Sequence, residues 1–247
     1  MASKAMTDLS WLTARPIAHR GYHDQNKTVW ENTLSAFQRA VDKGFAIECD
    51  VHLSSDGVPM IFHDQGLERL TGTDGFIWQR TAGELAALRI GGTADHVPTL
   101  RELLDLVDGR VPLVVELKGI PGRDDGLVKR VCDMLHGYKG KVAIMSFDHW
   151  LVRQFPAHAK KIPTGLTAYG TKNHEVEPHF SMLAYGISFT SYSVTELPNR
   201  FVDFVREKLS MPVITWTVRD RAMVEHTFAH ADQMTFEGFD PDANLTS

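Results

Sequence analysis

The amino-acid sequence predicts an α/β fold, a (β/α)8 TIM barrel with a small insertion after the second strand. Short β-rich apolar segments alternate with helically spaced segments almost from end to end, which is typical of parallel sheets. An open, doubly wound sheet would give the same alternation. Eight strands within 247 residues favour closure, because a barrel of eight strand–helix units takes roughly 250 residues.

The composition is that of an ordinary globular protein. Hydrophobic residues make up 43% of the chain and charged residues 23%, which supplies enough apolar material for a core and excludes disordered and coiled-coil classes. The formal net charge of −5 argues against a nucleic-acid partner, whose phosphates require clustered Lys and Arg. A small phosphodiester substrate, held by one or two cationic side chains, is compatible with this charge.

The chain carries no sequence signal for export or for stable membrane association. Cys49 and Cys132 are too few for a disulfide framework and match no zinc pattern, so we expect reduced thiols. The N-terminal segment lacks the apolar stretch of a signal peptide, and no run of about 18 apolar residues occurs. These observations predict a cytoplasmic protein.

Eight apolar runs predict buried strands. They are Pro16–Ala18, Phe45–Val51, Val111–Leu117, Val142–Met145, Pro163–Ala168, Tyr185–Phe189, Pro212–Val218 and Ala231–Phe236. Helical spacing of apolar residues is found between them. The predicted helices are Thr33–Lys43, Leu100–Val107, Gly126–Leu135, His149–Phe155, Leu197–Lys208 and Arg219–Ala229, with a weaker pattern at Pro178–Leu183.

Local signals mark several helix ends. Asn32 precedes the first predicted helix and is expected to cap it, and Gly44 stands where that helix would end. Thr99 and Glu102 have the spacing of a capping box at the start of the second predicted helix.

The alternation is interrupted once, at about residues 52–98. Here Asp56-Gly57 predicts a hairpin turn between His52-Leu53 and Val58–Phe62, and a stretch rich in Gly and Thr follows. We interpret this segment as an insertion at the mouth of the barrel, within a single domain that spans residues 1–247.

Acidic side chains stand in two of the predicted strands. Residues i and i+2 of a strand point to the same face, so Glu48 and Asp50 are aimed together. Glu116 ends the third strand, and the carboxyl ends of barrel strands converge on one mouth. Buried carboxylates need a cation or a proton, and an all-oxygen ligand set favours Mg²⁺ or Ca²⁺ over zinc.

Basic and imidazole side chains follow strands that lead to the same mouth. His19 and His63 each end an apolar run, and two imidazoles can divide the work of withdrawing and donating a proton. Arg20 offers bidentate binding to a phosphate, and Lys118 is expected to face the mouth beside Glu116. Together with the three acids, these residues indicate metal-assisted phosphoryl chemistry.

The sequence resembles the glycerophosphodiester phosphodiesterase family, in its bacterial cytoplasmic form, over residues 15 to about 220. The resemblance rests on short motifs that fall in the family's order and spacing. They are His19-Arg20-Gly21, Glu31-Asn32-Thr33, Glu48-x-Asp50, Asp56-Gly57, His63-Asp64, Glu116-x-Lys118 and Thr215-Trp216-Thr217-Val218.

This resemblance implies a (β/α)8 barrel with a small insertion after the second strand, one divalent cation, and three groups of site residues. The metal ligands would be Glu48, Asp50 and Glu116, the acid–base pair His19 and His63, and the substrate-binding residues Arg20, Lys118 and Trp216. From composition alone, Trp216 would be a core residue, and its position at a strand end is what favours a substrate-binding role. Glu31 and Asn32 are expected to brace the first loop.

The chain departs from the family pattern at two places. The family usually has Pro before Glu-Asn, whereas Trp30 stands here. After the last strand the family tends to have Thr-Asp-x-Pro, whereas this chain has Thr235-Phe236-Glu237-Gly238-Phe239.

The expected reaction is metal-dependent hydrolysis of glycerophosphodiesters to sn-glycerol 3-phosphate and an alcohol. A lysophospholipase D or a sphingomyelinase D-like lyase is the alternative on the same scaffold, and it would need an apolar groove for an acyl chain. A non-catalytic phosphoester-binding barrel is the alternative of another class, and it would be expected to have lost a histidine or a carboxylate. The sequence leaves open which histidine is the acid, and whether water or the glycerol 2-hydroxyl attacks first.

Overall fold

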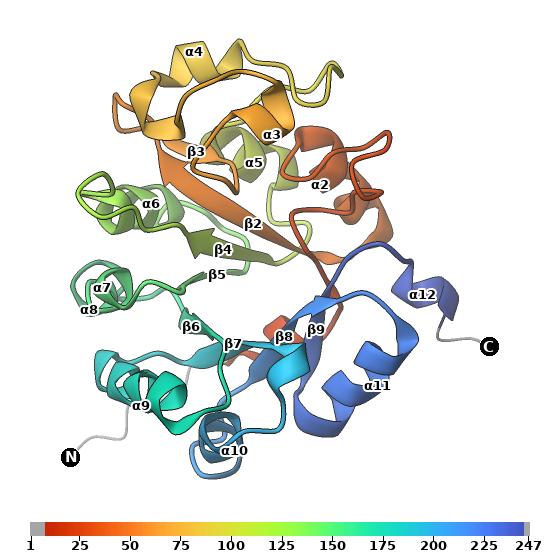
Figure 1. The fold of residues 1–247 in the computed structure, drawn as a ribbon, viewed down its shortest axis with the longest axis vertical. Coiled ribbons are helices and arrows are strands. Elements are labelled where there is room, and N and C mark those ends of the chain that lie inside the picture. The colour runs from red at the N-terminus through yellow and green to blue at the C-terminus, as the bar shows by residue number, and fades with distance from the viewer. Residues whose placement is uncertain (1–7, 245–247) are drawn as a thin grey trace.

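A computed structural model of the chain describes residues 8–244, so both ends of the predicted domain, residues 1–7 and 245–247, lie outside the described residues. Parallel strands form a closed barrel that helices surround (Figure 1). Strand β1 (Ile17–Ala18) pairs in parallel with both β2 (Ala46–Leu53) and β9 (Gln233–Phe236), and these two pairings close the sheet. The predicted (β/α)8 fold class is therefore confirmed, while the assignment of residues 1–247 to one domain stays a prediction.

The other barrel strands follow in chain order around the sheet. They are β4 (Leu113–Leu117), β5 (Val142–Ser146), β6 (Thr164–Ala168), β7 (Phe189–Ser193) and β8 (Val213–Val218). The longer helices are α2 (Leu34–Lys43), α5 (Leu100–Val107), α6 (Leu127–Leu135), α9 (Asn173–Met182), α10 (Arg200–Glu207) and α11 (Arg221–His230). Their apolar faces pack on the outward side chains of the strands, and this layer forms the larger core.

Short helical segments complete the description. They are α1 (Ser10–Thr13), α3 (Glu68–Thr71), α4 (Ala82–Ala86), α7 (His149–Val152), α8 (Phe155–His158), α12 (Pro241–Asn244) and the 3-10 turns η1 (Ile77–Gln79), η2 (Leu183–Tyr185) and η3 (Val194–Glu196). Among residues 8–244, none of the helices has the length and apolar character needed to cross a membrane.

The strand predicted at Tyr185–Phe189 is wrong. Leu183–Tyr185 form the turn η2, and β7 begins only at Phe189 and runs to Ser193. The apolar pattern fails because the face of β7 that lines the barrel interior carries Ser191 and Ser193. Polar side chains on the inward face of β7 thus take the place of the apolar residues by which a buried strand is predicted.

Two predictions about helices also need correction. The helix predicted at His149–Phe155 is divided into α7 and α8. The cap of α2 is Thr33 and not Asn32, because the Thr33 hydroxyl accepts from the N–H of Ala36 at 3.2 Å. Asn32 instead donates to a carboxylate of the site described below.

Other predicted helix signals are confirmed. Gly44 ends α2 in a left-handed conformation, with φ of 67°. Thr99 and Glu102 form the predicted capping box of α5. The weak pattern at Pro178–Leu183 belongs to the second half of α9 and to the start of η2.

A small apolar cluster fills the end of the barrel at which the parallel strands begin. Leu9, just before α1, and Leu12 of α1 belong to this cluster with Phe189, and Ile17 and Ile214 join them from the strands. The backbone of α1 is fixed by a hydrogen bond from the Gln233 amide to the carbonyl oxygen of Thr13, at 2.9 Å. This closed end leaves the carboxyl ends of the strands as the open end.

The inserted segment has a small core of its own. Strand β3 (Pro59–Ile61) pairs antiparallel with β2 through the predicted hairpin turn, and Figure 1 shows α3 and α4 together beyond β3. Met60, Phe62 and Leu70 belong to a buried cluster separate from the main core. Trp30, the first departure from the family pattern, packs on this segment: a Cβ at Gly91 would lie only 2.0 Å from the Trp30 ring.

We predict that Phe189→Ala destabilises the protein by about 3–5 kcal/mol, the usual cost of removing a buried phenyl ring. Phe189 is fully buried, and its ring occupies the space beside Gly165, where a Cβ would lie 2.4 Å from it. Urea unfolding followed by circular dichroism measures the loss. Phe228→Ala, at a side chain that is 47% exposed, serves as the control. A loss for Phe189→Ala no larger than that of the control would contradict this packing.

Candidate active site

All eight residues singled out in the sequence line one cavity of about 350 Å³. The cavity lies at the carboxyl ends of the strands. His19 and Arg20 follow β1, Glu48 and Asp50 lie on β2, Glu116 lies on β4 with Lys118 directly after it, His63 follows β3, and Trp216 lies on β8. The topology therefore brings residues from distant parts of the chain to a common wall, as convergence of strand ends requires.

Three carboxylates form the centre of this wall. Asp50 and Glu116 are paired in register across β2 and β4, and Glu48 precedes Asp50 by two residues on the same face. One oxygen of each of the three lies within 4.8 Å of the others, and all three side chains are buried. Cys49, between them, points outward into the apolar core.

Burial and mutual repulsion disfavour full ionisation of this cluster. Burial, together with the charges of Asp50 and Glu116, raises the pKa of Glu48 well above its usual value. Burial likewise raises the pKa of Glu116. A site that attracts positive charge this strongly, and that offers only oxygen ligands, fits a hard divalent cation.

Two cationic side chains lie against the cluster. The Lys118 ammonium contacts Glu116 and lies 2.9 Å from Asp50 Oδ1. Arg20 Nε lies 3.4 Å from Asp50 Oδ2, and the backbone N–H of Arg20 donates to Glu48 at 3.0 Å. Burial opposes the ionisation of Asp50, but Lys118 and Arg20 hold its pKa well below the usual range. Asn32 adds a hydrogen bond to Asp50 Oδ2 at 2.9 Å.

The loop after β1 adopts an uncommon backbone to reach the cluster. Arg20 has a left-handed conformation, with φ of 55°, and Gly21 follows with φ of 81°. A Cβ at Gly21 would lie 2.9 Å from that of Ala36, so only glycine lets the loop pass this close to α2. This conformation turns the N–H of Arg20 toward Glu48.

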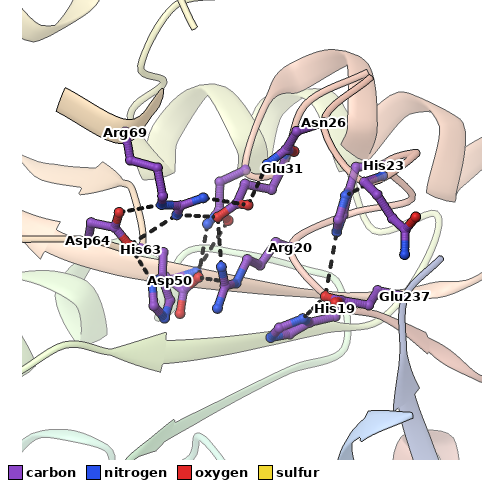
Figure 2. Close-up of polar contacts among 12 residues, drawn as sticks. His19, Arg20, His23, Asn26, Glu31, Asp50, His63, Asp64, Arg69 and Glu237 are labelled. Carbon is purple, nitrogen blue, oxygen red and sulfur yellow. Dashed lines mark hydrogen bonds and ion pairs between the residues drawn. The ribbon is translucent and has the colours of Figure 1, made fainter. Parts of the chain in front are cut away.

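Each of the two candidate histidines has Nδ1 bound to a carboxylate. His19 Nδ1 lies 2.7 Å from Glu237 Oε2, and His63 Nδ1 lies 2.7 Å from Asp64 Oδ1 (Figure 2). Because a carboxylate only accepts, these contacts place the proton on Nδ1 and leave Nε2 of the neutral ring as an acceptor. His19 Nε2 lies 3.9 Å from Glu48 Oε2, so it faces the carboxylate cluster.

Burial and nearby carboxylates act in opposite directions on the pKa values of the two histidines. Burial lowers the pKa of His19 and of His63 below the usual value, although Glu237 acts in the opposite direction on His19 and Asp50 does so on both. Burial also opposes the ionisation of Glu237, yet the hydrogen bond from His19, with His23 Nε2 3.8 Å from Oε2, holds its pKa well below its usual range. Glu237 is therefore a charged partner for His19. It is itself fixed by Arg219, whose Nε donates to Oε1 at 2.7 Å.

Arg69, on α3 of the insertion, links the two sides of the site (Figure 2). Its guanidinium donates to both oxygens of Glu31, at 2.8 and 3.0 Å, and to both oxygens of Asp64, at 2.5 and 3.0 Å. Glu31 also accepts from Arg20 at 2.7 Å, while Asp64 orients His63. One side chain of the insertion thus holds two of the carboxylates that position site residues.

Aromatic side chains cover the opposite wall. Phe147, after β5, packs edge-on against Trp216 with ring centroids 5.1 Å apart, and Tyr169 lies beyond it at 6.1 Å. Tyr169 is 58% exposed, so this wall extends to the surface of the molecule. Phe147 also lines the cavity.

Glu237 and Arg69 were not identified as site residues from the sequence. Glu237 lies in the atypical segment after the last strand, 218 residues from the histidine it contacts, and only barrel closure brings the two together. Arg69 follows His63-Asp64 by a few residues, within the stretch interpreted only as an insertion. The short spacing from Asp64 was the available signal for Arg69, whereas Glu237 had none beyond its position at a strand end.

Comparison with known proteins gives a consistent family assignment. A sequence model of the glycerophosphoryl diester phosphodiesterase family matches residues 19–243. A glycerophosphodiester phosphodiesterase of Caldanaerobacter subterraneus is 35% identical over 162 residues, which cover 61% of this chain and 65% of that relative's length. A glycerophosphodiester phosphodiesterase of Bacillus altitudinis is 26% identical over 90% of this chain and 84% of its own length.

Solved structures share the fold. A phosphodiesterase of Oleispira antarctica, solved with its product sn-glycerol-3-phosphate, superposes with a TM-score of 0.79 at 23% identity, covering 91% of this chain and 92% of its own. A glycerophosphodiester phosphodiesterase of Thermotoga maritima has a TM-score of 0.70 at 25% identity, with coverage of 90% and 94%. Because the family model spans nearly all of the described residues, the chain belongs to the glycerophosphoryl diester phosphodiesterase family, and at that level the expected enzyme class is confirmed.

Proposed function

We propose that this protein hydrolyses glycerophosphodiesters to sn-glycerol 3-phosphate and an alcohol, as a cytoplasmic enzyme with one Mg²⁺ or Ca²⁺ ion. One observation carries the proposal: three buried carboxylates share one cavity with two histidines, each held at Nδ1 by a further carboxylate. The family assignment and the product named for the Oleispira structure support the same reaction.

Glu48, Asp50 and Glu116 are the residues that would hold the cation, with Asn32 fixing the orientation of Asp50. When bound, a divalent cation supplies neutralisation of the phosphodiester charge. Arg20 and Lys118 would contact the phosphate oxygens from the same wall. Arg20 suits this role because its Nε has no hydrogen-bond partner among the described residues, although it is buried.

His19 and His63 would exchange protons with the nucleophile and the leaving alcohol through Nε2. Their Nδ1 protons are held by Glu237 and Asp64, so each ring is fixed in the tautomer that a general base needs. One ring, neutral at the start, would take a proton from the nucleophile at Nε2. The other would start as an imidazolium paired with its carboxylate and would donate its Nε2 proton to the departing oxygen, so the two rings exchange protonation states. The proton count therefore balances whichever histidine acts as base, and Trp216 would provide an apolar surface beside the reacting group.

We expect turnover of glycerophosphocholine to vanish in EDTA and to return with Mg²⁺ or Ca²⁺, because the three carboxylates that would hold the cation line the cavity. Release of glycerol 3-phosphate, measured with a coupled dehydrogenase, follows the reaction. Lysophosphatidylcholine is assayed in parallel. Preference for the lysolipid would instead favour the lysophospholipase D alternative, and tight substrate binding without turnover would favour a non-catalytic barrel.

We predict that Glu48→Gln weakens metal activation by more than about tenfold, since it removes one charged ligand. Without metal the variant should unfold at the wild-type temperature or above, because repulsion from Asp50 and Glu116 is relieved. Thermal unfolding with and without Mg²⁺ measures both effects. Glu207→Gln, at an exposed side chain, is the matched control. An unchanged metal requirement in a fully active Glu48→Gln enzyme would refute the metal site.

We predict that His19→Ala lowers kcat by about 10²–10⁴, the usual contribution of general acid–base catalysis. The fold should survive, because Arg219 still pairs with Glu237. Turnover of glycerophosphocholine and circular dichroism test the two statements together. His174→Ala, at an exposed histidine of α9, controls for loss of an imidazole. Turnover within about fivefold of the wild type would exclude His19 from the acid–base pair.

A further inference from the structure

The inserted segment is docked against the chain that follows β1. The ring of Trp30 packs on Gly91, where a Cβ would lie only 2.0 Å from it, and it also packs on the apolar cluster of the insertion. The N–H and the hydroxyl of Ser35 donate to Asp95 Oδ1, at 3.3 and 3.0 Å. None of these four residues lines the cavity. Packing outside the cavity therefore fixes the insertion beside Glu31, which follows Trp30 directly.

Arg69 is held by this docking between two carboxylates of the site (Figure 2). Among residues 8–244, the basic side chains paired with Glu31 are Arg69 and Arg20. Those paired with Asp64 are Arg69 and His63. Arg69 therefore shares one carboxylate with Arg20 and the other with His63. Arg69 does not line the cavity, so it can act on the reaction only through these two carboxylates.

The charge around Arg20 depends on Arg69. Burial opposes the charge of Arg20, but three nearby carboxylates, Glu31 among them, raise its pKa. Burial also opposes the ionisation of Glu31, yet the hydrogen bond from Arg69 and the charge of Arg20 lower its pKa to about 2. In the network that these three residues form with Asp64, two guanidinium charges balance two carboxylates. Without Arg69, one negative charge would remain beside the place proposed for the phosphate, and it would repel that anion.

We propose that Arg69 is a positioning residue with two separate effects on the reaction. It compensates the charge of Glu31, so that Arg20 is available to the phosphate, and it holds Asp64 in place against Nδ1 of His63. One guanidinium of the insertion thereby couples phosphate binding to proton transfer. The inference rests on the proposed function for the roles of Arg20 and His63, but its first effect is measured by binding alone.

Calorimetric titration of the full chain with inorganic phosphate, in the presence of Mg²⁺, tests the first effect. We expect Arg69→Gln to weaken phosphate binding about tenfold, within the range of coupling in one salt-bridge network, because a negative charge is left uncompensated. The double variant Glu31→Gln/Arg69→Gln restores the charge balance and should bind phosphate within about twofold of the wild type. Arg69→Lys, which keeps the charge, should do the same. Arg89→Gln, at an exposed arginine of the insertion that donates to the carbonyl oxygen of Ala94, is the matched control.

Turnover of glycerophosphocholine tests the second effect. Arg69→Gln and the double variant should both lower kcat about tenfold, because Asp64 lacks Arg69 in each, whereas KM should rise in the single variant alone. Phosphate binding that Arg69→Gln leaves unchanged, or that the double variant weakens further, would overturn the proposal, since a merely structural role gives one of these results. If the wild type turned over no glycerophosphocholine while the phosphate affinities followed the expected pattern, the proposed function would fall and the effect of Arg69 on Arg20 would stand.

Discussion

The site is organised around the cost of burying three carboxylates in one place. Glu48, Asp50 and Glu116 lie on adjacent strands, where water cannot screen their repulsion. Lys118 and Arg20 offset the charge of Asp50 and Glu116, while Glu48 is left with a strongly raised pKa. The cluster is therefore short of positive charge by about one group. That deficit is of the sign that a bound divalent cation would remedy.

Three further carboxylates hold the side chains that surround this cluster. Glu237 orients His19, Asp64 orients His63, and Glu31 orients Arg20. Arg69 then connects two of these three carboxylates, so the insertion contributes to the geometry of both His63 and Arg20. A planar guanidinium with five N–H donors can serve two carboxylates at once, which a lysine ammonium does less well. The insertion is thus part of the site's support and not merely a cover.

The sequence predicted the parts of the structure that local rules determine. Alternation of side chains on a strand aimed Glu48 and Asp50 together, and strand-end convergence brought His19 and Glu116 to one mouth. The strand that was predicted wrongly, β7, carries Ser191 and Ser193 inward, so its inward face lacks the apolar residues by which a buried strand is found. Glu237 escaped notice because its contact with His19 depends on closure of the barrel between β9 and β1. Local pattern cannot report such a contact.

The cavity is divided between two parts of the chain with different tasks. Strands β1, β2 and β4 carry the charged groups, while β5 to β8 carry neutral hydroxyl and aromatic side chains. Glu237 and Arg219 are exceptions, and they face the charged side through His19. Substitutions in the neutral half leave the charge balance of the carboxylates untouched, because they neither add nor remove an ion. Side chains of the neutral half can therefore vary without disturbing the charged side of the cavity, which is a general property of sites built from separate strand ends.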